Sequence, residues 1–69
     1  MSFRLVVFPP LEERDYYLPQ RLLIKHGATL SELCDDLRWM FNSDCLVRVY
    51  DAEEHCELAQ VQHKHIQFL

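Results

Sequence analysis

The sequence has one glycine, no long apolar run and few basic side chains. A single glycine excludes a flexible linker or disordered tail, because such segments are rich in glycine and polar residues and poor in hydrophobic ones. The apolar stretches fall well short of the roughly 18 residues that a membrane helix needs, so we expect no membrane partner. No secretory leader precedes the first predicted strand either.

The use of cysteine and of positive charge excludes further classes. The chain has an odd number of cysteines, and they lack the C-x-x-C spacing of zinc and thioredoxin-like motifs. The cysteines are Cys34, Cys45 and Cys56. They are typical of free thiols in a reducing compartment, which indicates a cytoplasmic or nuclear protein. The net charge is −4, and the seven basic residues are scattered along the chain. We therefore expect no nucleic-acid partner, because phosphate binding draws on clustered Lys and Arg.

What the chain does contain is typical of one folded domain. Hydrophobic residues make up 49% of its 69 residues, which suffices for one core but not for two. We expect a single domain over residues 1–69.

Residues 28–42, ATLSELCDDLRWMFN, give the clearest local signal. Thr29 and Glu32 form an S/T-x-x-E capping box, which satisfies backbone N–H groups of the first helical turn. Downstream, apolar residues recur with the helical period and polar residues occupy the opposite face. The sequence predicts an amphipathic helix that starts near Thr29 and packs with its apolar face on a flat surface. Its apolar stripe comprises Leu30, Leu33, Cys34, Leu37, Met40 and Phe41.

Extended segments lie on both sides of this helix. Residues 3–8, FRLVVF, are apolar and β-branched and stop at two prolines, which predicts a central strand. Residues 16–24, YYLPQRLLI, predict a second strand, and Pro19 places it at a sheet edge or a bulge. After the helix we expect a third strand at 45–50, a short fourth at 56–58, a polar connection at 59–64 and a fifth strand at 65–69.

The predicted order is a hairpin, one helix and two or three further strands. One helix excludes a helix bundle, and a doubly wound α/β fold needs more crossovers than this chain can hold. The order and length resemble the ubiquitin-like β-grasp superfold over essentially the whole chain. The resemblance implies an α+β domain with one helix packed on a mixed sheet of four to five strands, in the order ββαβ(β)β. It also implies a sheet face or edge that is presented to protein partners.

Within that superfold, the segment LVRVYDAEEHCEL is similar to the acidic segment of PB1 domains, where a strand ending in tyrosine runs into a carboxylate-rich loop. Asp51, Glu53 and Glu54 match this pattern, and Glu57 is a looser match. The resemblance implies a contact with a basic patch on another PB1 domain. The loop lacks a Gly-Asp pair, and the first strand carries Arg4 where basic-face members usually present a lysine.

Metal and catalytic sites have weaker support. His55, Cys56, His63 and His65 form the only His/Cys grouping, but His55 and Cys56 are adjacent and would point apart on a strand. Cys34 lies on the apolar stripe of the helix, where a thiol is more often a small core residue than a nucleophile. We therefore expect no cofactor, no metal and no enzymatic activity, with metal binding by the His/Cys group as an alternative.

Charged turns and outlying aromatic residues are the candidates for partner binding. Clustered carboxylates on an exposed turn dock on basic partners, and aromatic side chains dominate interface hot spots. Trp39 falls off the apolar stripe of the helix, and the paired tyrosines of the second strand point to opposite faces. The expected partner-binding residues are Asp51, Glu53, Glu54, Tyr17, Arg21, Lys25 and Trp39.

Together these features predict a non-catalytic, ubiquitin-like protein-interaction module that is part of a larger protein. One alternative is a self-associating, PB1-like scaffold or oligomerisation domain, in which the acidic turn of one copy meets Arg4, Arg21 and Lys25 of the next. The other alternative is a small accessory or metal-binding subunit of an enzyme complex.

Overall fold

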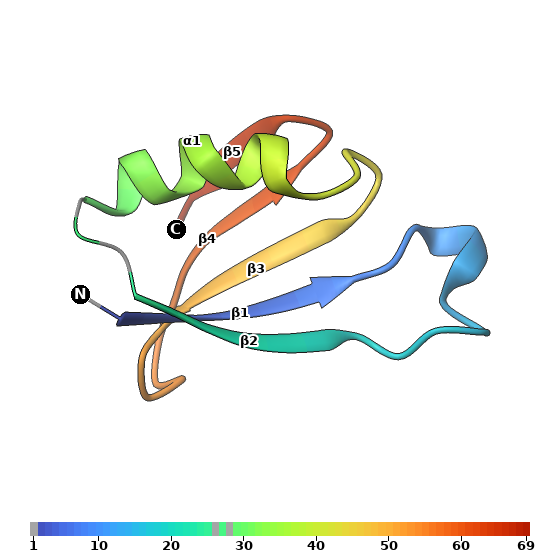
Figure 1. The fold of residues 1–69 in the computed structure, drawn as a ribbon, viewed down its shortest axis with the longest axis horizontal. Helices are drawn as coiled ribbons and strands as arrows, with labels where there is room; N and C mark the ends of the chain where they lie inside the picture. Colours follow the sequence, from blue (N-terminus) through green and yellow to red (C-terminus); the bar gives the residue numbers. More distant parts are fainter. Residues whose placement is uncertain (1, 26, 28) are drawn as a thin grey trace.

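The computed structural model describes residues 2–25, 27 and 29–69. Within these residues, five strands form one antiparallel sheet, and a single helix packs on one of its faces (Figure 1). The chain is therefore an α+β fold. Its elements are β1 (Ser2–Phe8), a short 3-10 turn η1 (Leu11–Glu13), β2 (Gln20–Lys25), α1 (Leu30–Met40), β3 (Leu46–Asp51), β4 (Glu57–Gln62) and β5 (His65–Phe68).

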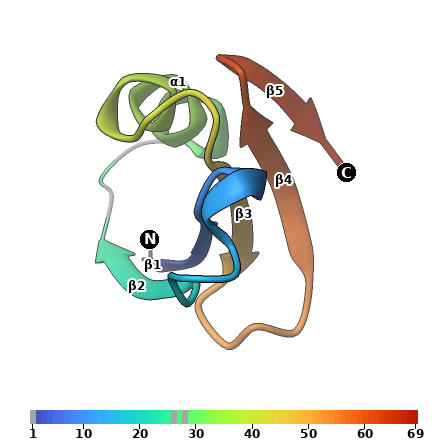
Figure 2. The same ribbon diagram turned by 90° about the vertical axis from the view of Figure 1, so that its right-hand side faces the viewer.

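The strand order in the sheet is β2-β1-β3-β4-β5. Both β2 and β3 pair antiparallel with β1, so α1 carries the chain from one side of β1 to the other. β4 then forms a hairpin with β3, and β5 forms a hairpin with β4, so both pairs are antiparallel. All four pairings are antiparallel, so the predicted mixed sheet is wrong. Figure 2 shows the sheet curling from β2 round to β5, with α1 on its concave side.

The helix begins where the capping box predicts. The Thr29 Oγ1 atom accepts a hydrogen bond from the Glu32 backbone N–H at 3.3 Å, while Ala28 lies outside the described residues. Met40 is 57% exposed, so its predicted place in the core is wrong. The chain leaves the helical conformation at Phe41, and the Phe41 side chain packs against the core instead.

The core lies between α1 and the concave face of the sheet. Alternate residues of each strand point to this face, because successive side chains of a strand lie on opposite sides. Polar residues take the alternate positions on β4, which explains its pattern of Ala59 and Val61 between glutamines. The buried cluster comprises Phe3, Leu5, Val7, Leu33, Cys34, Leu37, Val47, Val49, Ala59 and Val61.

Two predicted strand boundaries are corrected. The second strand begins at Gln20 rather than Tyr16, because the backbone N–H groups of Tyr16 and Tyr17 donate to the Glu13 carbonyl (3.0 and 3.1 Å) and close a turn. The short fourth strand is extended to Gln62, through the residues expected to form a polar connection. The predictions that β1 is central and that β2 is an edge strand are confirmed.

A two-residue turn joins β4 to β5. His63 (φ 52°) and Lys64 (φ 58°) both have left-handed backbone conformations, which two-residue hairpin turns require. Trp39 on α1 lies close to this turn, because the Lys64 Nζ atom is 4.6 Å from the centre of the Trp39 ring. No helix within the described ranges has the length and apolar character needed to cross a membrane.

Candidate protein-docking site

The connection between β1 and β2 carries a group of exposed apolar side chains. In Figure 1 this connection projects beyond the end of α1, and we call its residues 11–18 the arm. Leu11, Tyr16, Tyr17 and Leu18 of the arm are between 64% and 88% exposed. A run of large apolar side chains in water is unfavourable, and such a patch commonly marks an interaction site.

Local contacts hold the arm in place. Pro9 and Pro10 end β1, and the Glu13 backbone N–H donates to the Pro10 carbonyl at 2.8 Å to form η1. The Arg14 Nε atom donates to the Pro9 carbonyl at 3.0 Å, and its guanidinium lies 5.7 Å from the centre of the Phe8 ring. The exposed side chains are therefore displayed from a folded turn, which lowers the conformational entropy lost on binding.

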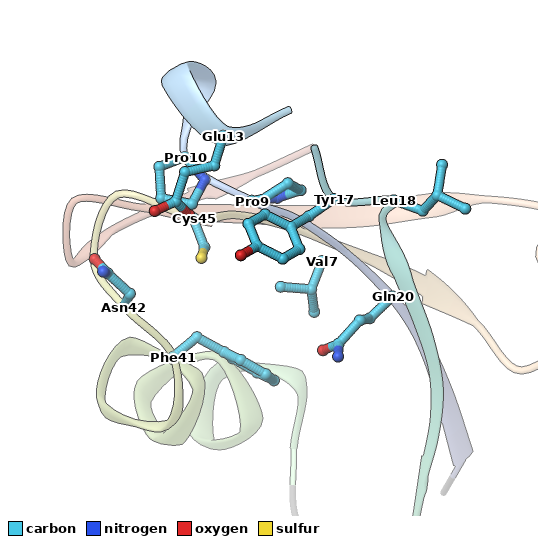
Figure 3. A pocket seen from close by; sticks show the side chains of 10 residues that line it. All are labelled: Val7, Pro9, Pro10, Glu13, Tyr17, Leu18, Gln20, Phe41, Asn42 and Cys45. Carbon is cyan, nitrogen blue, oxygen red and sulfur yellow. The ribbon is translucent and has the colours of Figure 1, made fainter. Parts of the chain in front are cut away.

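A cavity of about 360 Å³ lies at the base of the arm, next to the end of α1. This volume is within the range of small-ligand and side-chain pockets. Figure 3 shows the Tyr17 ring on one side of the opening and the Phe41 ring on the other, with Cys45 and Asn42 at the left margin. The lining residues are Val7, Pro9, Pro10, Glu13, Tyr17, Leu18, Gln20, Phe41, Asn42 and Cys45.

The chemistry of this pocket suits binding of an apolar group. Aromatic and aliphatic side chains form most of its walls, while Gln20 and Asn42 supply amide groups at the margin. The Asn42 Oδ1 atom accepts a hydrogen bond from the Asp44 backbone N–H at 2.9 Å, which fixes the amide. Burial, with the nearby carboxylates of Glu13 and Asp44, raises the pKa of the Cys45 thiol. The thiol is therefore protonated at neutral pH, and in that form it is a poor nucleophile.

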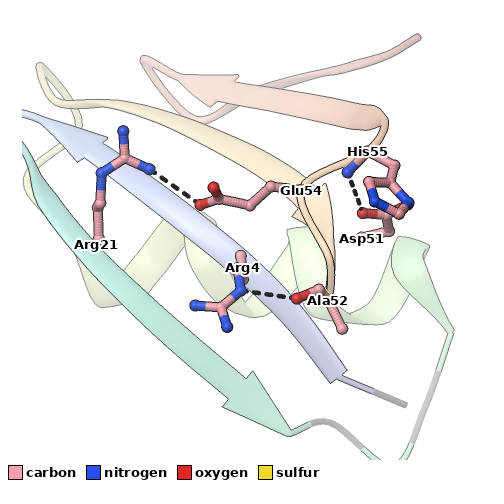
Figure 4. Close-up of polar contacts among 6 residues, drawn as sticks. All are labelled: Arg4, Arg21, Asp51, Ala52, Glu54 and His55. Atoms are coloured by element: carbon pink, nitrogen blue, oxygen red, sulfur yellow. Dashed lines mark hydrogen bonds and ion pairs between the residues drawn. The ribbon is translucent and has the colours of Figure 1, made fainter.

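The predicted partner-binding residues fall into three places. Tyr17 lines the pocket, whereas Trp39 lies on α1, 67% exposed and beside Lys64. The acidic turn and β2 meet on the other face of the sheet, where the Glu54 Oε1 atom lies 3.0 Å from the Arg21 Nη1 atom (Figure 4). Glu54 of the acidic turn and Arg21 of the predicted basic patch therefore belong to one contact within the chain. Lys25 lies on β2, and Asp51 and Glu53 lie at the end of β3 and in the turn that follows it.

The His/Cys group is dispersed. The His55 Nδ1 atom lies 3.4 Å from Glu53, and the His63 Nε2 atom lies 3.3 Å from Asp44. Within the described ranges, no three His, Cys, Asp or Glu side chains come together in a group that could hold a metal ion. Cys34, Cys45 and Cys56 are free thiols.

Sequence reasoning missed the pocket and most of its lining. The pocket joins residues 7–20 to residues 41–45, and no local pattern in either segment indicates that they meet. The one available signal is Phe41, which follows the apolar stripe at the end of the helix. The comparisons add no assignment to this site, because no family model, no curated protein and no solved structure matches the chain.

Proposed function

We propose that the protein is a non-catalytic protein-interaction module, and that the arm and its pocket bind an apolar segment of a partner. The observation that carries this proposal is the exposure of Leu11, Tyr16, Tyr17 and Leu18 beside a pocket of about 360 Å³. Aromatic residues near a pocket are the usual energetic centre of a protein interface. A partner side chain that enters between Tyr17 and Phe41 would cover apolar surface on both proteins.

A ubiquitin-like β-grasp relationship remains part of this proposal. The order of a hairpin, one crossing helix and further strands supports it. The antiparallel pairing of β1 with β3 departs from the mixed sheet that the resemblance implies. The three free thiols support a reducing location, and we propose the cytoplasm or the nucleus.

Self-association is the second candidate. The sequence predicts that the acidic turn of one copy meets Arg4, Arg21 and Lys25 of the next, but Glu54 pairs with Arg21 of its own chain. This internal contact favours a different protein as partner.

The test is selection of random peptides on the folded domain, followed by mapping of the bound peptide by NMR. We expect selected peptides to carry an aromatic or large aliphatic residue and to shift the amide signals of residues 9–20 and 41–45. Tyr17→Ala should weaken binding by about tenfold or more, as expected of a hot spot. Met40→Ala, which also removes an exposed apolar side chain, is the matched control and should leave the affinity unchanged. Peptides that shift only β4 and β5, or that bind Tyr17→Ala with full affinity, would contradict the proposal.

A further inference from the structure

The face of the sheet opposite α1, which we call the outer face, carries a group of arginine side chains. On β1, Phe3, Leu5 and Val7 point into the core, so the residues between them point to the outer face. Val6 pairs with Arg21 on β2 and with Arg48 on β3, which places these three side chains in one row across the sheet. Basic residues that are scattered in the sequence are gathered here by strand register.

The group is larger than this row. The guanidinium groups of Arg14 and Arg48 lie 5.7 and 5.5 Å from the centre of the Phe8 ring, in the range of cation–π contacts. Arg4 and Lys25 occupy outer-face positions of β1 and β2. Five of the seven basic residues of a chain with net charge −4 thus lie on or beside one face: Arg4, Arg14, Arg21, Lys25 and Arg48.

The turn between β3 and β4 already places a carboxylate on this face (Figure 4). The Glu54 carboxylate pairs with Arg21 at 3.0 Å, and the Arg4 Nε atom donates to the Ala52 carbonyl at 2.7 Å. Glu54 has a left-handed backbone conformation (φ 59°), which is unfavourable for a residue with a Cβ atom. The Asp51 Oδ1 atom steadies the turn by accepting the His55 backbone N–H at 2.8 Å. The outer face therefore already accepts a carboxylate from a solvent-exposed turn.

The Arg48 side chain is 39% exposed, so part of its guanidinium remains open to another carboxylate. Its Nε atom is buried and makes no hydrogen bond within the described part of the chain, and this atom lies 3.9 Å from the Glu57 Oε1 atom in a long ion pair. Val6 between the two arginines is only 6% exposed, so the row has an apolar floor. Charge-assisted hydrogen bonds over such a floor are stronger than those in open water. A guanidinium also has five N–H donors, of which a single contact engages only a part.

We propose that the outer face binds an extended acidic segment of another protein, whose carboxylates contact Arg21 and Arg48, and that Glu54 is an internal competitor for this site. Side chains at alternate positions of an extended segment are about 7 Å apart on one face, and long arginine side chains can reach both. Two carboxylates on one face of such a segment match the guanidinium groups of Arg21 and Arg48. A nucleic acid brings a long row of phosphates that would also meet the acidic remainder of the chain.

The experiment measures fluorescence anisotropy of a labelled octapeptide in which glutamate and serine alternate, with the glutamine counterpart as the ligand control. Arg21→Ala and Arg48→Ala should each weaken binding by about tenfold. Glu54→Gln should strengthen binding by about two- to fivefold, because it removes a competing exposed ion pair. Arg38→Ala on α1 is the matched control, since it removes an equal charge from a side chain paired with Asp35 on the helix.

Four results would overturn the inference: no binding of the glutamate peptide at low salt, equal losses for Arg38→Ala and Arg48→Ala, no gain for Glu54→Gln, or tighter binding of a short oligouridylate than of the peptide. Circular dichroism of each variant shows whether it is folded. The arm contributes Arg14 to the basic group, but Tyr17 lines the pocket beside Phe41 and neither Arg21 nor Arg48 does, so Tyr17→Ala should leave this binding unchanged. Failure here and failure of the proposed docking site are therefore separate outcomes.

Discussion

Truncation of Leu37 tests the register of the helix and the extent of the core. Leu37 is 1% exposed and lies in the buried cluster with Leu33 and Cys34. Removal of a buried leucine side chain beyond Cβ loses its transfer free energy and leaves a cavity, at a cost of about 2–5 kcal/mol. For 69 residues the total stability is on the order of 3–10 kcal/mol. Leu37→Ala should therefore lose a large share of the total and lower Tm by more than about 10 °C.

The measurement is urea unfolding followed by far-ultraviolet circular dichroism, with Met40→Ala as the matched control. Met40 lies three residues later on the same helix and is 57% exposed, so its truncation should cost less than about 0.5 kcal/mol. Far-ultraviolet circular dichroism follows the whole backbone, so both variants are read on the same signal. If Met40→Ala costs as much as Leu37→Ala, the helix is rotated about its axis relative to this description, and the core assignment is refuted.

Two further predictions concern pH and the β4–β5 turn. Burial raises the pKa of the Cys34 thiol, so the unfolded chain loses this proton first and stability falls as pH rises above about 8.5. Cys34→Ala should reduce this alkaline loss in urea midpoints, with the part due to the raised pKa of Cys45 remaining, while Cys56→Ala, at an exposed thiol, retains all of it; equal slopes for both variants would contradict the assignment. His63→Gly should raise stability by about 0.5–1 kcal/mol at about pH 8, because it relieves a left-handed conformation. His65→Gly, in β5, should lower the stability. A stability change of the same sign in both variants would contradict the left-handed turn at His63.

The helix start and the position of β1 follow from local chemistry, and the sequence therefore predicts them well. The capping box at Thr29 involves residues three apart, and the alternation in β1 needs only its own side chains. The direction of pairing between β1 and β3 depends on where the helix returns the chain, which no local pattern encodes. The second half of β4 is predicted to be a polar connection because it contains Gln60 and Gln62, although Ala59 and Val61 alternate with them as in a strand.

The candidate sites were predicted in part. Tyr17 and Arg21 were selected from the sequence, and both lie at proposed binding surfaces. Arg48 lies between the buried Val47 and Val49 of β3 and so points away from the core, but the sequence does not indicate its neighbour across the sheet. Its closeness to Arg21 depends on two strand registers, and the pocket beside Phe41 depends on tertiary packing. Such juxtapositions of distant segments are the part that composition and periodicity leave undetermined.

The open ends of the sheet bear on how the protein behaves at high concentration. Within the part of the chain that the structure describes, β2 and β5 each have one neighbouring strand, so each presents unpaired backbone groups to which a strand of another chain can pair. β2 carries Arg21 and Lys25 and follows directly after Pro19, and charge and proline at an edge oppose strand addition. β5 is only four residues long, which limits the ladder it offers. Arg21, which pairs with Glu54, thus also opposes hydrogen-bonded pairing between the β2 edges of two copies of the protein.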